Sequence, residues 1–236
     1  MAFMRGLAES YVLDRVALLP YALGFDLHPC GDGIKAAEMK VIVTMFLSLL
    51  FASAAAAQDL PSTSLTRGTW DLGAFAGGGT GLGKSDNTQF FIAGGRVGRI
   101  LTSDHLSGWA RGNFEWAVDL MPAYIVFPPA GAVYGGSFKP VVWQWNFTSA
   151  KKISPYVGIA GGIVFSRGNI PPGDTSTVNF TTQGLIGAHI FTRQSRALQL
   201  EGAFGHFSSA SLGNHNPGYN AFFTFTIGYT WYKTAH

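Results

Sequence analysis

Hydrophobic and polar residues alternate along much of the chain, with a large apolar side chain at every second position. The pattern is clearest over 114–120, 141–147 and 221–231. Strict alternation is typical of a β-strand that presents one face to apolar and the other to polar surroundings. The same period, less regular, predicts five further strands at 69–76, 90–101, 153–165, 178–190 and 197–208.

The two faces of these strands predict a membrane barrel. One face carries Trp, Phe and aliphatic residues, and each strand approaches the ~9–11 residues that a tilted strand needs to cross a bilayer. We therefore expect an all-β fold, an eight-stranded antiparallel transmembrane β-barrel of the outer-membrane type. Such a barrel is narrow enough for side chains to fill it, and its closure leaves no unpaired edge in lipid. Six residues are expected to pair across the interior: Glu115, Asp119, Gln144, Asn146, Gln183 and Glu201.

The connections between predicted strands alternate in length. Short links are expected at 102–110, 148–152 and 192–196, and longer ones at 77–89, 121–138, 166–176 and 209–220. Short periplasmic turns alternating with longer external loops are typical of outer-membrane barrels. The apolar 121–138 segment, MPAYIVFPPAGAVYGGSF, is a candidate flap at the lipid surface.

Composition agrees with a membrane barrel. Charged residues make up only 12% of the 236 residues, aromatic residues make up 14%, and there are 31 Gly. Turns use Gly and membrane interfaces use aromatic rings. A soluble all-β domain, such as a periplasmic lipid-binding barrel, remains open on composition alone.

The N-terminal region predicts processing. Residues 39–57, MKVIVTMFLSLLFASAAAA, have the basic start, apolar run and small-residue end of a signal peptide, with cleavage expected after Ala57. Residues 1–38 would be a gene-model extension or an unstructured pre-segment, and 58–236 the barrel. Cys30 is the only cysteine and lies before the signal, so thiol and disulfide chemistry are not expected in the mature chain.

One short motif points to a different function. Residues 78–85, GGTGLGKS, match the phosphate-binding loop of nucleotide hydrolases. That loop requires a following helix whose N-terminus holds phosphate. Here DNTQFFIAGG follows, which predicts a strand. We interpret the match as a Gly-rich external loop and expect no nucleotide, nucleic acid, cofactor or metal.

Candidate chemistry lies near the end of the seventh predicted strand. His206 and Ser208 continue the outward-facing positions of Leu198 and Phe204. Ten residues at ~3.4 Å each and ~45° tilt climb about 24 Å, close to the ~25 Å height of the apolar band. The imidazole and hydroxyl would thus lie at the outer rim, where a serine beside a histidine can attack an acyl ester.

The stretch HFSSASLGNHNPGYN, 206–220, resembles the motif of the lipid A 3-O-deacylase family, acyloxyacyl hydrolase-like outer-membrane barrels. PYVGIAGG and VNFTTQGLIGA resemble the same family more loosely. The resemblance implies a serine esterase of the bacterial outer membrane that removes the 3-O-linked hydroxyacyl chain of lipid A. Its partners would be lipopolysaccharide and the membrane, and a homodimer stays open.

The resemblance also implies roles for single residues. Ser208 would be the nucleophile and His206 the general base. The family's acid, fourteen residues after the His, is here Asn220, whose amide oxygen can orient the imidazole. Backbone amides of Ser209 and Ser211 would form the oxyanion hole, where the family has Asn and Gly. The alternative function is a non-catalytic eight-stranded outer-membrane barrel with a structural or surface role.

Overall fold

The computed structural model describes residues 65–150, 152–170, 176–210, 212 and 220–234. The predicted extension, signal peptide and Cys30 lie outside these residues. In the described part, no helix has the length and apolar character needed to cross a membrane.

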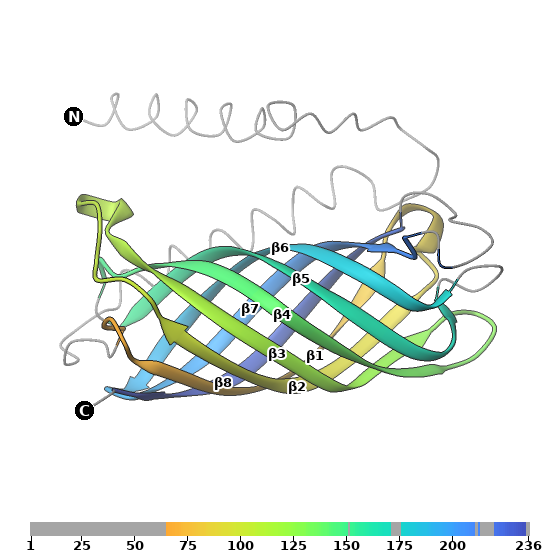
Figure 1. Cartoon of the computed structure of the whole chain (residues 1–236), viewed down its shortest axis with the longest axis horizontal. Coiled ribbons are helices and arrows are strands. Elements are labelled where there is room, and N and C mark those ends of the chain that lie inside the picture. The colour runs from red at the N-terminus through yellow and green to blue at the C-terminus, as the bar shows by residue number, and fades with distance from the viewer. Residues whose placement is uncertain (1–64, 151, 171–175, 211, 213–219, 235–236) are drawn as a thin grey trace, which may run out of the picture. The chain divides into compact units, whose positions relative to one another are not determined.

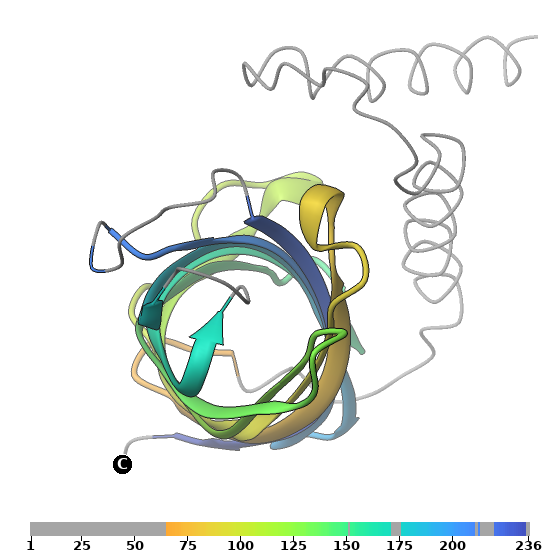
Figure 2. The ribbon, with the colours of Figure 1, turned by 90° about the vertical axis from the view of Figure 1, so that its right-hand side faces the viewer.

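The described chain forms one closed antiparallel barrel, as the alternation predicts (Figures 1 and 2). Each strand pairs with the next, and β1 also pairs with β8. We call the end where β1 begins and β8 ends the terminal end, and the opposite end the loop end. The strands are β1 (Trp70–Gly81), β2 (Gln89–Ile100), β3 (Gly112–Phe127), β4 (Val133–Phe147), β5 (Ile153–Ile170), β6 (Ser176–Arg193), β7 (Arg196–Ser208) and β8 (Asn220–Lys233).

The outer surface is apolar because the large residues of each alternating pair face outward. Aliphatic side chains such as Leu120, Ile159 and Ile227 are about half exposed around the middle of the wall. Aromatic residues gather towards both ends, like the girdles that mark the two interfaces of a membrane barrel. The group at the terminal end includes Trp70, Phe114, Trp143 and Trp231, and the group at the loop end includes Phe91, Phe127, Tyr134, Phe165 and Phe180.

The interior holds a bonded polar network. Arg96 donates to Asp119 at 2.7 and 3.0 Å and to Glu201 at 3.2 Å. Tyr156 also donates to Glu201, at 2.8 Å. Buried charges are tolerable only when paired and hydrogen-bonded, and these are. All six predicted interior residues lie inside. Arg96 also donates to Gln144 at 3.4 Å, and Gln144 and Asn146 donate to Glu115 at 3.2 and 2.8 Å. Gln183 accepts from Lys139 at 2.7 Å in a separate pair.

Apolar clusters close both ends of this interior. At the loop end, Phe207 packs on Phe90 and Phe222, with ring centroids 5.9 and 4.6 Å away. At the terminal end, Leu65 is 3% exposed and its carbonyl accepts a 2.8 Å hydrogen bond from Asn113. The polar pairs inside the barrel thus lie between two apolar end clusters.

Three of the four predicted long loops are shorter than expected, and the fourth, 209–220, differs by one residue. The links at the loop end span 82–88, 128–132, 171–175 and 209–219, whereas those at the terminal end span 101–111, 148–152 and 194–195. The expected flap at 121–138 is mostly wall, because β3 runs to Phe127 and β4 starts at Val133. A register shift between Met121 and Tyr124 interrupts the alternation, so the pattern did not predict that the strand continues there. Length alternation is thus a weaker feature of this barrel than the sequence suggested.

Candidate active site

Strand β7 presents His206 and Ser208 on the outer face of the barrel. The intervening Phe207 is buried, and so are Glu201 and Ala203, which share its inward parity. Phe204, which shares the parity of the pair, is 43% exposed. His206 and Ser208 are half-buried. The alternation alone fixes this orientation, since a one-residue slip would turn both groups inward.

The pair lies at the loop end of the wall. Ser208 is the last residue of β7 and pairs with Phe180 of β6, a member of the loop-end aromatic group. His206 pairs with Thr182 on one side and with Ala221 on the other. Aromatic rings concentrate where acyl chains meet polar headgroups. An ester at that depth lies beside the pair without entering the barrel.

The backbone turns sharply directly after Ser208. The amide of Ala210 donates to Ser208 Oγ at 3.2 Å, and the amide of Leu212 donates to the Ser209 carbonyl at 2.9 Å. Ala210 has a φ of 47°, in the left-handed region that a non-Gly residue seldom occupies. Strained backbone of this kind clusters at functional sites. A backbone amide aimed at a serine oxygen can stabilise negative charge there.

The other predicted site residues are placed less completely. Ser209 follows the inward parity and is 3% exposed, so its side chain points away from the pair. Asn220 begins β8 and pairs with the inward-facing Phe207, with no register shift between β7 and β8. The side chain of Asn220 and all of Ser211 lie outside the described residues. The third catalytic position and the Ser211 amide therefore stay predictions.

The pairing between β6 and β7 places one further residue beside the candidate site that could not be predicted from the sequence. Thr182 of β6 lies directly opposite His206, and its side chain is exposed. Directly opposed residues of antiparallel strands have Cβ atoms about 4.5–5.5 Å apart. Alternation predicts which face of the sheet a residue occupies. It does not predict which residue lies opposite on the next strand, so the sequence alone could not place Thr182 beside His206.

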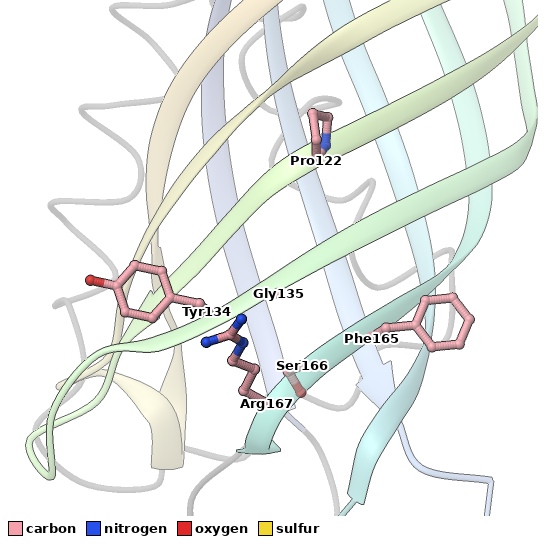
Figure 3. Close-up of a pocket in the computed structure, with 6 residues that line it drawn as sticks. All are labelled: Pro122, Tyr134, Gly135, Phe165, Ser166 and Arg167. Atoms are coloured by element: carbon pink, nitrogen blue, oxygen red, sulfur yellow. The ribbon is translucent and has the colours of Figure 1, made fainter.

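Two hollows in the outer wall lie away from this pair. The larger, about 640 Å³, is lined from β3, β4 and β5 by residues that include Tyr134, Phe165 and Arg167 (Figure 3). The smaller, about 480 Å³, lies over β8 and β1 to β3, around Leu72, Leu120 and Trp231. Neither includes β7.

The phosphate-loop match lacks the helix that nucleotide binding requires. The expectation that GGTGLGKS is a loop is wrong for its first half, because residues 78–81 belong to β1. Its end forms a three-residue 3₁₀ turn, η1 (Gly83–Ser85), and the strand predicted after it is β2. A phosphate loop needs a helix at that place. Within the described ranges, no three His, Cys, Asp or Glu side chains gather as metal ligands would.

Comparisons with known proteins bear on the same region. A family model described as Lipid A 3-O-deacylase (PagL) matches residues 93–230, which include the whole of β7. The crystal structure of the outer membrane enzyme PagL is 15% identical, covering 68% of this chain and 98% of its own, with a TM-score of 0.40. The N-terminal β-barrel domain of Pseudomonas aeruginosa OprF is 11% identical, covering 70% and 98%, with a TM-score of 0.43. Neisserial surface protein A (NspA) is 8% identical, covering 69% and 96%, with a TM-score of 0.40. No curated protein matches the sequence.

Proposed function

This chain belongs to the lipid A 3-O-deacylase family of the bacterial outer membrane, and on that premise we propose that it is a serine esterase that hydrolyses the 3-O-linked hydroxyacyl ester of lipid A. One observation carries the proposal. His206 and Ser208 share the outer face of β7 at the loop end of the barrel. With both termini on the periplasmic side, as we propose for this barrel with an even number of strands, that end meets the outer leaflet, where lipid A resides.

The proposed reaction proceeds through an acyl-enzyme. Ser208 Oγ attacks the ester carbonyl carbon while His206 accepts the hydroxyl proton. The tetrahedral intermediate collapses, the bond to the sugar O3 breaks, and His206 returns the proton to that oxygen. Water, deprotonated by His206, then attacks the acyl-serine, the bond between the acyl carbon and Ser208 Oγ breaks, and His206 returns the proton to Oγ as the hydroxy fatty acid leaves. Backbone amides after Ser208 supply the donors for the oxyanion, a contribution typically worth about 10²–10³ in kcat for one donor.

Lipid A from a lipopolysaccharide-bearing host that expresses the protein tests the activity. Mass spectrometry should show loss of one hydroxyacyl chain with the wild type, and no loss with Ser208→Ala or His206→Ala. Ser166→Ala is the matched control, because Ser166 lies at the loop end on β5 and bonds only locally, to the Gly168 and Thr177 carbonyls. Unchanged lipid A in the presence of heat-modifiable, folded wild-type barrel would refute the esterase proposal.

The third catalytic position is proposed for Asn220. Its amide oxygen would accept a hydrogen bond from the imidazole and orient it, as an Asn does in papain-like enzymes. Asn220→Glu should raise the deacylation rate, because a carboxylate also stabilises the imidazolium. Asn220→Ala should lower the rate. Equal rates for all three proteins would remove Asn220 from the site and leave the histidine oriented by another group.

A non-catalytic barrel is the second candidate. The register pairs Asn220 with Phe207, whose side chain faces inward, and the family's acid is absent at this position. A barrel without the family's acid would have lost turnover and kept a structural or surface role. Folded wild-type and Asn220→Glu proteins that both leave lipid A intact would favour this reading.

A further inference from the structure

Exposed basic residues gather at the terminal end of the barrel. These residues lie on or next to seven of the eight strands, all except β4. Within the described residues, Asp104 is the single acidic side chain at this rim that reaches the surface, and it is paired with Arg111 at 2.8 Å; Asp71 and Glu115 lie buried on the inner face. The remaining excess of positive charge is unbalanced. The exposed basic residues are Arg67, Arg99, Arg111, Arg193, Arg196 and Lys233, and Lys152 is half-buried at the same end.

The loop end shows no such excess. The charged side chains that the structure describes at that end are Asp86 and Arg167, one of each sign. The positive charge is therefore a property of one rim and not of the whole surface. Solubility alone does not require positive charge to be concentrated at one end. A negatively charged ligand at that rim explains the concentration.

Three of the basic residues form a compact cluster with two tryptophans. Trp70 of β1 pairs with Arg99 of β2 on one side and with Lys233 of β8 on the other. The next outward row pairs Trp231 with Arg196 of β7. The Arg99 guanidinium carbon lies 5.2 Å from the Trp70 ring centroid. The cluster thus runs continuously over four neighbouring strands.

The orientation of this cluster is towards lipid. Arg99, Arg196 and Lys233 continue the outward-facing rows of Val97, Leu198 and Trp231. Trp rings prefer the level of lipid headgroups, and long basic side chains extend from apolar surface to reach the same level. Cations at that depth face the phosphates of the adjoining leaflet.

From these contacts we propose that the rim formed by Arg99, Trp70, Lys233, Trp231 and Arg196 binds the headgroup of an anionic phospholipid. The ligand is a phosphodiester lipid with net negative charge in the leaflet opposite to lipid A. The cations hold the phosphate, and the two tryptophans pack beside the glycerol region. The proposal does not depend on the esterase activity, because it concerns the other end of the barrel and another lipid.

The tryptophans themselves provide the assay. All six in the chain lie towards the terminal end, at positions 70, 109, 116, 143, 145 and 231. Fluorescence of the folded protein in vesicles therefore reports on lipids at that rim. Brominated phosphatidylglycerol and brominated phosphatidylcholine, each at the same mole fraction, quench in proportion to their presence beside the rings. Binding predicts stronger quenching by the anionic lipid at low salt.

Removing the positive charges then tests whether the cluster causes the stronger quenching by the anionic lipid. Each basic residue near an anionic surface contributes about fivefold in lipid affinity. The triple change Arg99→Gln, Arg196→Gln, Lys233→Gln should therefore abolish the preference for phosphatidylglycerol. Arg167→Gln at the loop end is the matched control and should keep it. About 1 M salt, which shortens the Debye length to ~3 Å, should weaken the preference of the wild type as well.

Two results would overturn the proposal. One is equal quenching by both lipids with the folded wild type at low salt. The other is a preference that survives the triple change in a folded barrel. If the triple variant does not fold, the single change Arg196→Gln and the salt titration decide in its place. After the first of these results, binding of peptidoglycan fragments at this rim would assign the charge to a periplasmic polymer.

Discussion

Arg96 connects the interior carboxylates, and its removal should be the most damaging single polar change in the barrel. Arg96 and Asp119 are 2% and 1% exposed, and Glu201 is 6% exposed. Arg96→Met keeps most of the side-chain volume but leaves both carboxylates without their guanidinium. Loss of one partner of a buried pair typically costs about 3–5 kcal/mol.

The structure places the expected value near the lower limit of that range. Glu201 keeps its 2.8 Å hydrogen bond from Tyr156, and the Lys139 ammonium still attracts Asp119. We therefore expect a loss of about 3 kcal/mol. With a urea dependence of about 2 kcal/mol per molar, the midpoint of unfolding should fall by about 1.5 M.

Urea titration of the protein folded in zwitterionic micelles measures this loss, with the folded fraction read from unheated gels. Arg167→Met is the control, since Arg167 is exposed at the loop end and should change stability by less than about 0.5 kcal/mol. The second change Asp119→Leu, added to Arg96→Met, should recover part of the loss by removing a stranded charge. An Arg96→Met barrel within about 1 kcal/mol of wild type would refute the view that this network is energetically coupled.

Three further changes test local features. Gly187→Ala places a Cβ against the buried Tyr156 ring and should lower the free energy of unfolding by about 1–3 kcal/mol in the same titration. Gly184→Ala, on the same strand, meets open space and should not destabilise the barrel. Equal effects of the two changes would contradict the packing. Burial opposes ionisation of Asp104, but hydrogen bonds from neighbouring side chains outweigh it and lower the pKa below 3.8. Asp104→Asn should therefore be less stable than wild type at neutral pH, and the difference should vanish as pH falls below 3.8 through the lower pKa of the folded state; a pH-independent difference would rule this out. Ala210→Gly should keep deacylation because Gly accepts the positive φ, whereas Ala210→Val should lower the rate at least about 10-fold by displacing the amide from Ser208; similar rates for both would argue against that contact.

The period-two pattern was sufficient for the barrel and for the face of the candidate pair. All eight strands occur where alternation placed them, and His206 and Ser208 face outward with Phe204. This success has a simple cause. A strand in a membrane wall has lipid on one side and packed side chains on the other, so each residue's environment is set by its parity alone.

Features that depend on neighbouring strands were beyond this reasoning. The register that sets Thr182 opposite His206 depends on turn geometry as well as on pattern. The wall over 121–138 was missed because a bulge breaks the alternation between Met121 and Tyr124. Arg96 was not singled out because its three partners lie on three other strands, which only the closed barrel brings together.

The caps at the two ends of the interior have an electrical consequence. Phe90, Phe207 and Phe222 fill one mouth and Leu65 the other, and bonded side chains occupy the space between. Ions entering from either side would meet dry aromatic or aliphatic surface, without the continuous water column that conduction requires. A planar bilayer containing the protein should therefore show no single-channel steps, and a cell can carry many copies without making its outer membrane leaky.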